Sequence, residues 1–146
     1  MKITNNFDAL EFIKTHLLNQ GQRSMAPDTT CKYFVDNGDL EHPLQCAVGA
    51  LIDAELYSED LEGVPADSHI IIDVVRRSNP LWHVDSNSIR MLKNAQMVHD
   101  CLQPNQWEKF FEKTSLAEFC RSTEQAFVDV INNFIMYENK QLGDYI

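Results

Sequence analysis

Apolar residues recur at helical spacing in the first part of the chain. Between a capping asparagine, Asn5 or Asn6, and Gly21 they repeat three, four and seven positions apart, as on one face of a helix. We therefore predict a first helix that ends at Gly21 and packs this face against the core. The apolar residues of the face are Phe7, Leu10, Phe12, Ile13, Leu17 and Leu18.

Residues 31–35 have the composition of a β-strand. They lead into the sequence Asp36-Asn37-Gly38-Asp39, and Asn-Gly is a strong hairpin signal because both residues tolerate positive φ. Pro43 restricts the returning strand to an edge or to a short segment, because proline has no N–H to donate. The pattern predicts a small β-hairpin near residues 31–46.

Two apolar runs follow the predicted hairpin. The first, Ala47–Ile52, predicts a short buried helix in which Gly49 lets another element approach closely. The second, residues 69–75, is rich in β-branched residues, which favours a strand, but the basic pair Arg76-Arg77 and the following Asn79-Pro80 are typical of a helix end. We favour a helix for residues 69–75.

The remainder of the chain has helical spacing. One segment is capped by Ser86 or Ser88 and stopped by Pro104, and capping-box spacing from Ser122 to Gln125 opens a last helix. Helical spacing also assigns an aromatic cluster between these segments to the core, namely Trp107, Phe110 and Phe111.

Length and composition complete the prediction of the fold. A chain of 146 residues with 44% hydrophobic residues is long enough to bury one continuous core. We predict a single domain over residues 1–146 of the α+β class, predominantly α-helical, with the small hairpin near residues 31–46.

The charge balance narrows the classes of partner. The chain has 12 Lys and Arg against 22 Asp and Glu, a formal net charge of −10. This charge repels nucleic acid and anionic membranes, whose binding depends on Lys and Arg. It favours encounter with a protein that has a basic surface.

The lack of a recognisable targeting segment predicts a cytoplasmic location, and this location in turn predicts the state of the cysteines. The sequence contains no apolar run near the ~20 residues that span a bilayer, and no hydrophobic stretch of signal-peptide length precedes Asp8. We expect a cytoplasmic protein without a cofactor, whose cysteines are thiols rather than disulfides. The cysteines are Cys31, Cys46, Cys101 and Cys120.

The first candidate site is a metal site near the predicted hairpin. Cys31, His42 and Cys46 supply ligand types that zinc prefers, and His99 could complete a set of four. The spacing lacks a Cys-x-x-Cys pair, so ordinary packing of small thiols in the core is the favoured alternative.

A second candidate is a thiol enzyme centred on Cys46, His99 and Asp100. A thiol at a helix start is acidified, a histidine can act as its base, and a carboxylate can orient that base. Glu62 is an additional acid or ligand candidate. Complete catalytic motifs such as Gly-x-Ser-x-Gly or His-Glu-x-x-His are absent from the sequence.

A third candidate is a docking surface for a protein. The densest run of carboxylates, over residues 53–62, fails the EF-hand pattern because Ser58 occupies the place of the required glycine. Its alternatives are a solvated face or a contact for basic residues. Trp82 lies in a predicted loop and is the candidate for an exposed anchor. The binding residues we predict are Glu55, Glu59, Asp60, Glu62 and Trp82.

Several motifs occur together in the sequence: Cys31-x-Tyr33, Gln45-Cys46-Ala47-Val48-Gly49-x-Leu51-Ile52, Tyr57, Leu61-Glu62-Gly63, Gln96-x-x-His99-Asp100 and Trp107. Together they resemble the pattern of a family of small uncharacterised proteins in phage and bacterial genomes. Ala50 stands where many members have a further cysteine, a departure that weakens a metal or thiol site carried over from the family. The resemblance covers about residues 31–110 and implies no activity, but it implies a phage context in which small acidic proteins bind and redirect a host protein.

From these observations the sequence predicts a non-enzymatic, acidic protein-binding module, plausible as a phage-encoded modulator or inhibitor of a host protein in the host cytoplasm. The alternative is a small thiol- or metal-dependent enzyme centred on Cys46, His99 and Asp100.

Overall fold

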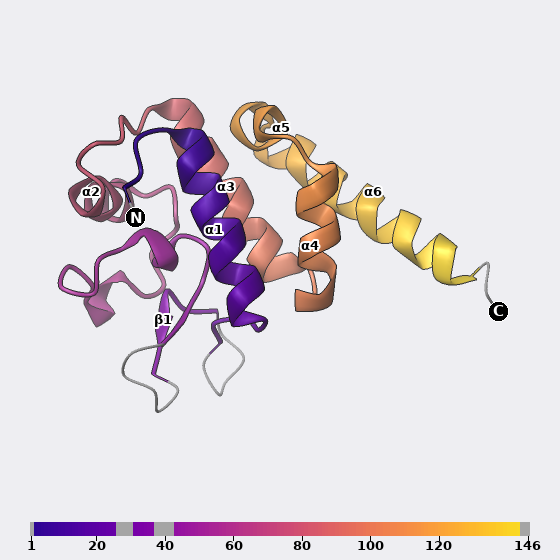
Figure 1. Cartoon of the computed structure of the whole chain (residues 1–146), viewed down its shortest axis with the longest axis horizontal. Helices are drawn as coiled ribbons and strands as arrows, with labels where there is room; N and C mark the ends of the chain where they lie inside the picture. The colour runs from indigo at the N-terminus through magenta and orange to yellow at the C-terminus, as the bar shows by residue number, and fades with distance from the viewer. Residues whose placement is uncertain (1, 26–30, 37–42, 144–146) are drawn as a thin grey trace.

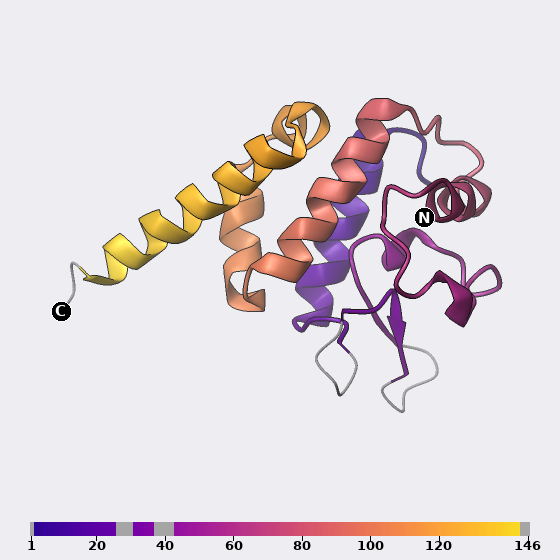
Figure 2. The same ribbon diagram turned by 180° about the vertical axis from the view of Figure 1, so that it is seen from behind.

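Two helices, α1 (Asn6–Gln20) and α3 (Ser86–Cys101), lie side by side through the centre of the molecule and run in the same direction (Figures 1 and 2). The structure is a computed structural model that describes residues 2–25, 31–36 and 43–143. Three helices pack on one side of the central pair: α4 (Pro104–Lys113), α5 (Leu116–Arg121) and α6 (Glu124–Gly143). The elements on the other side are β1 (Phe34–Val35), β2 (Leu44–Gln45), the short 3-10 helices η1 (Gly49–Leu51) and η2 (Glu59–Leu61), and α2 (His69–Ser78).

The predicted α+β class is confirmed, since helices dominate and the sheet is a two-stranded antiparallel hairpin. Phe34 pairs with Gln45 and Val35 with Leu44. The first strand is shorter than predicted because its earlier backbone donors bond elsewhere. The N–H of Lys32 donates to the carbonyl of Ser24, and that of Tyr33 donates to a side-chain carboxylate. Most of the predicted turn, residues 37–39, lies outside the described residues.

The first helix begins and ends where the sequence predicts. Asn5 caps it by accepting the N–H of Asp8 at 2.8 Å, and Gly21 ends it with a φ of 69°. Its buried face is narrower than predicted, however, because Phe7 and Leu18 are 58% and 41% exposed. The face that packs against the core consists of Ala9, Leu10, Ile13 and Leu17.

The ambiguous run at residues 69–75 is helical, as favoured. In α2 one face of the helix is buried, so the apolar run is accommodated in the core without forming a strand. The buried side chains are those of Ile71, Ile72, Val74 and Val75. Ser68 caps its start by accepting the N–H of Ile70.

Two predicted caps are displaced by one residue. Helix α3 is capped by Asp85, which forms a capping box with Ser88, rather than by Ser86 or Ser88. At the start of α6, Thr123 accepts the N–H of Ala126, in place of the predicted box from Ser122. Ser122 instead ends α5, where its N–H donates to the carbonyl of Glu118.

An aromatic cluster holds the three C-terminal helices together. Phe110 lies edge-on to Phe119, Phe127 and Phe134, with ring centroids 5.3 to 6.3 Å apart, a favourable geometry for aromatic pairs. Trp107 and Phe111 are also buried, so the predicted aromatic core is confirmed. The C-terminal part of α6 extends beyond the rest of the molecule (Figures 1 and 2).

Within the described residues, no helix combines the length and the apolar character needed to cross a bilayer.

Candidate functional site

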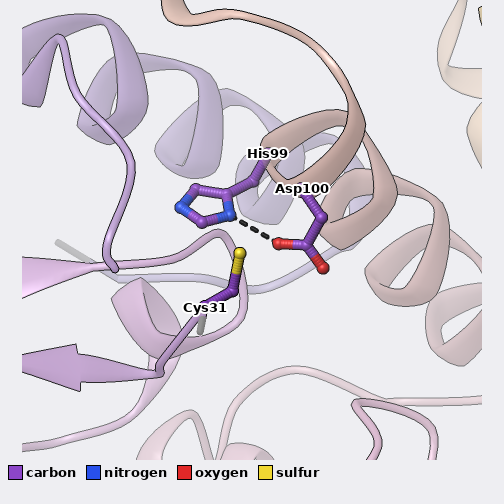
Figure 3. A group of neighbouring side chains, drawn as sticks. All are labelled: Cys31, His99 and Asp100. Atoms are coloured by element: carbon purple, nitrogen blue, oxygen red, sulfur yellow. Dashed lines mark hydrogen bonds and ion pairs between the residues drawn. The ribbon is translucent and has the colours of Figure 1, made fainter. Parts of the chain in front are cut away.

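Cys31, His99 and Asp100 form a compact polar cluster between the end of α3 and the segment before β1 (Figure 3). One potential ligand atom from each residue lies within 4.8 Å of the others. An isolated antiparallel bridge from Met25 fixes Cys31 in the chain segment that precedes the hairpin. His99 and Asp100 belong to the last turn of α3.

Both ring nitrogens of His99 are engaged. Nε2 accepts the backbone N–H of Ser24 at 3.0 Å, and Nδ1 lies 2.7 Å from Oδ1 of Asp100. A nitrogen that accepts an N–H carries no proton, so the hydrogen bonds assign the proton to Nδ1 and leave the ring neutral. The ring is fully buried and stacks on Trp107 with centroids 5.7 Å apart. His99 therefore has no free nitrogen with which to take a proton.

Asp100 joins α3 to the segment that contains η1. Its Oδ1 also accepts the side-chain N–H of Gln96 at 2.9 Å, while the side-chain oxygen Oε1 of Gln96 accepts the backbone N–H of Val48 at 3.1 Å. Arg23 caps the same end of α3 through hydrogen bonds to the carbonyls of His99 and Leu102. A positive charge at the C-terminus of a helix interacts favourably with the helix dipole. These bonds connect the segment after α1 and the segment that contains η1 to the end of α3.

The thiol of the cluster is not activated. Burial, together with the charge of Asp100 and a hydrogen bond to that carboxylate, raises the pKa of Cys31 to about 11. At neutral pH the sulfur is therefore a protonated donor to Asp100 rather than a thiolate nucleophile.

The thiol centre predicted on Cys46 is corrected by the structure. The thiol in the group with His99 and Asp100 is that of Cys31, and Cys46 is 1% exposed. Burial raises the pKa of Cys46 to about 12, and its sulfur accepts the N–H of Gly49. Cys46 is thus a core residue that caps the turn into η1. All four cysteines are free thiols.

The predicted metal set is only partly assembled. Cys31 and His99 come together, Cys46 does not belong to the described group, and His42 lies outside the described residues. A metal on Nδ1 of His99 would move the ring proton to Nε2, where it would face the N–H of Ser24. Two opposed N–H donors repel one another, so the hydrogen bonds of His99 disfavour its use as a metal ligand.

A small cavity of about 170 Å³ lies beside the cluster. Many of its lining residues belong to the motifs that resemble the phage and bacterial family. These residues come from segments that are far apart in the sequence. Gly49, from the same motifs, approaches the backbone of Tyr33 so closely that a Cβ would overlap it. The motif residues that line the cavity are Cys31, Tyr33, Cys46, Glu62, Gln96 and Asp100.

Glu62 fastens the hairpin to the acidic segment. Its carboxylate accepts the backbone N–H groups of Tyr33 at 3.0 Å and Phe34 at 3.3 Å, and the hydroxyl of Tyr57 at 2.6 Å. The side chain is half-buried. Predicted as a binding residue, Glu62 also has this structural role, which the sequence does not reveal.

The remaining predicted binding residues separate into two groups. Glu55, Glu59 and Asp60 are exposed, as a docking surface requires. Trp82 is 4% exposed, so the prediction of an exposed anchor is wrong. Its indole N–H donates to Oδ1 of Asn6 at 2.9 Å, which draws the ring against the start of α1.

A second cavity, of about 250 Å³, was not predicted. The rings of Phe34 and Tyr57 lie against one another in its wall, with centroids 4.3 Å apart and planes tilted by 30°. Tyr57 is among the residues that resemble the phage and bacterial family, but no sequence pattern links it to Phe34, which lies far away along the chain. Acidic residues complete the lining, together with Val35 and Lys32: they are Asp36, Glu59 and Glu62.

Comparison with known proteins found no matching family model, no matching curated protein and no matching solved structure.

Proposed function

We propose that the protein is a non-enzymatic module that binds a basic segment of another protein. The observation that carries the proposal is the acidic rim, defined as Glu55, Glu59 and Asp60. All three side chains are exposed, and none forms an ion pair with a described Lys or Arg residue. A basic partner would supply the missing counter-charges.

The rim is held in place rather than carried on a loose loop. Ser58 caps η2 by accepting the N–H of Asp60, and the carbonyl of Asp53 accepts the N–H groups of Leu56 and Tyr57. The three carboxylates fall within six residues of sequence, and an opposite charge on a partner offsets the repulsion between like charges. The net charge of −10 adds long-range attraction for a basic protein.

The arrangement of the polar cluster supports binding over catalysis. Cys31 is held as a protonated thiol, and both nitrogens of His99 serve as hydrogen-bonding groups within the framework. We further propose, from the motifs that resemble phage and bacterial proteins, that the partner is a host protein whose activity is modulated on binding.

Charge reversal of the rim tests the proposal. The full chain would be titrated into a fluorescent Lys/Arg-rich peptide, with binding read as anisotropy at low and at physiological salt. In the variant Glu55→Lys, Glu59→Lys, Asp60→Lys we expect affinity to fall by about tenfold or more, because attraction becomes repulsion at the contact.

A matched control separates the rim from overall charge. The variant Glu108→Lys, Glu112→Lys, Asp129→Lys has the same net charge but changes exposed carboxylates on α4 and α6. We expect it to retain most of the affinity at physiological salt, where distant charges are screened. Equal losses in the two variants would contradict a rim-specific contact.

A further inference from the structure

The cavity between β1 and η2 combines aromatic faces with carboxylates. The rings of Phe34 and Tyr57 are tilted by 30° and form one wall, and both side chains remain partly exposed. Glu59, from the acidic rim, and Glu62 belong to the same lining. An aromatic face beside negative charge attracts an organic cation through both the ring quadrupole and the carboxylates.

The charge of Glu62 is not neutralised by any described residue. Its three hydrogen-bond donors are uncharged: the N–H groups of Tyr33 and Phe34 and the hydroxyl of Tyr57. Burial and the neighbouring Glu62 raise the pKa of Tyr57, so the phenol stays protonated and keeps donating. The carboxylate is therefore fixed in direction while its negative charge remains available to the cavity.

Among the described residues that line this cavity, the one cation is Lys32. Its ammonium group forms no ion pair with Glu59 or Glu62 in the described structure. Lys32 therefore leaves both carboxylates unpaired and would compete only weakly with an incoming cation.

The lining suits one organic side chain better than a metal ion or a large ligand. Among the described residues, the acidic side chains here do not converge as a set of three ligand atoms, unlike Cys31, His99 and Asp100. The volume of about 250 Å³ is below the roughly 300–1,000 Å³ typical of pockets for drug-sized molecules.

We propose that the cavity lined by Phe34, Tyr57, Glu59 and Glu62 binds an arginine side chain of the basic partner. This inference rests on the proposed function and adds a specific residue to it. The planar guanidinium stacks on aromatic rings and donates several N–H bonds to carboxylates in a fixed fork, whereas the ammonium of lysine is a compact and strongly hydrated point charge. The lysines of the same segment would contact the acidic rim.

A guest-residue series tests the proposal without altering the protein. A short peptide of lysine, glycine and serine would carry arginine, lysine or citrulline at one central position. Citrulline keeps the shape of arginine but has no charge. We expect arginine to bind about tenfold more tightly than citrulline and severalfold more tightly than lysine.

Variants then assign the arginine preference to the cavity. Tyr57→Leu removes one of the two rings and should abolish the preference. Lys32→Gln removes a like charge from the lining and should strengthen binding of the arginine peptide only slightly. Phe7→Leu changes an aromatic side chain that is 58% exposed on α1 and serves as the control. Thermal melting of each variant would confirm that it is folded, and the guest series on the unaltered chain does not depend on the variants.

The outcomes separate this inference from the proposed function. An arginine preference that disappears in Tyr57→Leu but not in Phe7→Leu supports the cavity. Equal binding of all three guests, with binding still lost on reversal of the acidic rim, overturns the cavity and leaves the proposed function standing. Binding that is indifferent to both guest and rim overturns both.

Discussion

The backbone N–H of Ser24 donates to Nε2 of His99 at 3.0 Å, in a place where both groups are fully buried. This bond makes the imidazole an acceptor on one side while Asp100 occupies the other side. The sequence neighbours of His99 suggest a general base. In the structure its ring instead connects the segment after α1 to the end of α3.

Replacing His99 should therefore destabilise the fold. In His99→Leu the N–H of Ser24 loses its acceptor, and a buried unpaired donor costs about 1–3 kcal/mol. The lost contact between the imidazole and Trp107 adds to that cost. Urea unfolding should show a decrease of about 2–4 kcal/mol in the free energy of unfolding. The exposed His83→Leu is the control, with a change within about 0.5 kcal/mol. Equal effects in the two variants would contradict the assigned role of His99.

The alkylation rate of Cys31 should respond to Asp100. Besides burial, the charge of this carboxylate and its hydrogen bond hold the pKa of Cys31 near 11. In Asp100→Asn the side-chain oxygen still accepts from His99 and Gln96, but the negative charge is lost. More thiolate forms at a given pH, so iodoacetamide labelling of Cys31, followed by peptide mass spectrometry, should accelerate about fivefold or more.

Two comparisons control the alkylation experiment. Asp129→Asn, on the exposed side of α6, should leave the rate unchanged. Cys46 should stay unlabelled in the native protein because it is buried. Rapid labelling of Cys46 in the folded wild type would contradict the structure and revive the thiol-enzyme alternative.

Gly49 should not tolerate a side chain. A Cβ at residue 49 would lie 3.0 Å from the carbonyl carbon of Tyr33 and closer still to its oxygen. Because the obstacle is backbone, relief requires movement of the hairpin. We expect Gly49→Ala to lower the free energy of unfolding by about 2–3 kcal/mol.

Gly21→Ala provides the comparison for Gly49→Ala. At Gly21 a Cβ meets no atom within 4 Å, although φ is 69°, and the expected cost is about 1 kcal/mol from the left-handed backbone alone. A cost at Gly49 no larger than that at Gly21 would be inconsistent with the close approach to Tyr33.

His16 should make stability depend on pH just below neutrality. Burial lowers the pKa of His16 from 6.5, and its Nε2 lies 3.1 Å from the carbonyl oxygen of Gln45. As pH falls, the unfolded chain binds this proton first, so the contribution is present above 6.5 and is lost as pH falls toward the lower folded value. Urea unfolding between about pH 7.5 and 5.5 should show a smaller loss of stability in His16→Gln than in the wild type. His69→Gln, at an exposed position, should behave like the wild type.

Local signals predict much of the fold. Asn5 and Gly21 mark the ends of α1 because a cap and a left-handed glycine act within a few residues. The run at residues 69–75 shows that burial on one helix face can override the strand preference of β-branched residues. The displaced caps at Asp85 and Thr123 show the limit of such signals, since neighbouring polar residues compete for the same N–H groups.

The site depends on contacts that no local pattern encodes. Cys31 meets Asp100, and the ring of Phe34 contacts that of Tyr57, only when the whole chain is folded. The sequence alone predicts an open loop at Trp82, yet Asn6, 76 residues away along the chain, supplies its hydrogen-bond acceptor. Exposure of the acidic rim was predictable because a dense run of carboxylates is costly to bury.

The most direct test of a basic-segment binding module is a titration of the isotope-labelled full chain with the arginine peptide, followed by amide chemical shifts. We expect the largest shifts at Glu55, Glu59 and Asp60 and at the adjoining Phe34 and Tyr57, with little change along α4 and α6. Small shifts spread over all exposed carboxylates, or no shifts at physiological salt, would contradict a defined binding site on this protein.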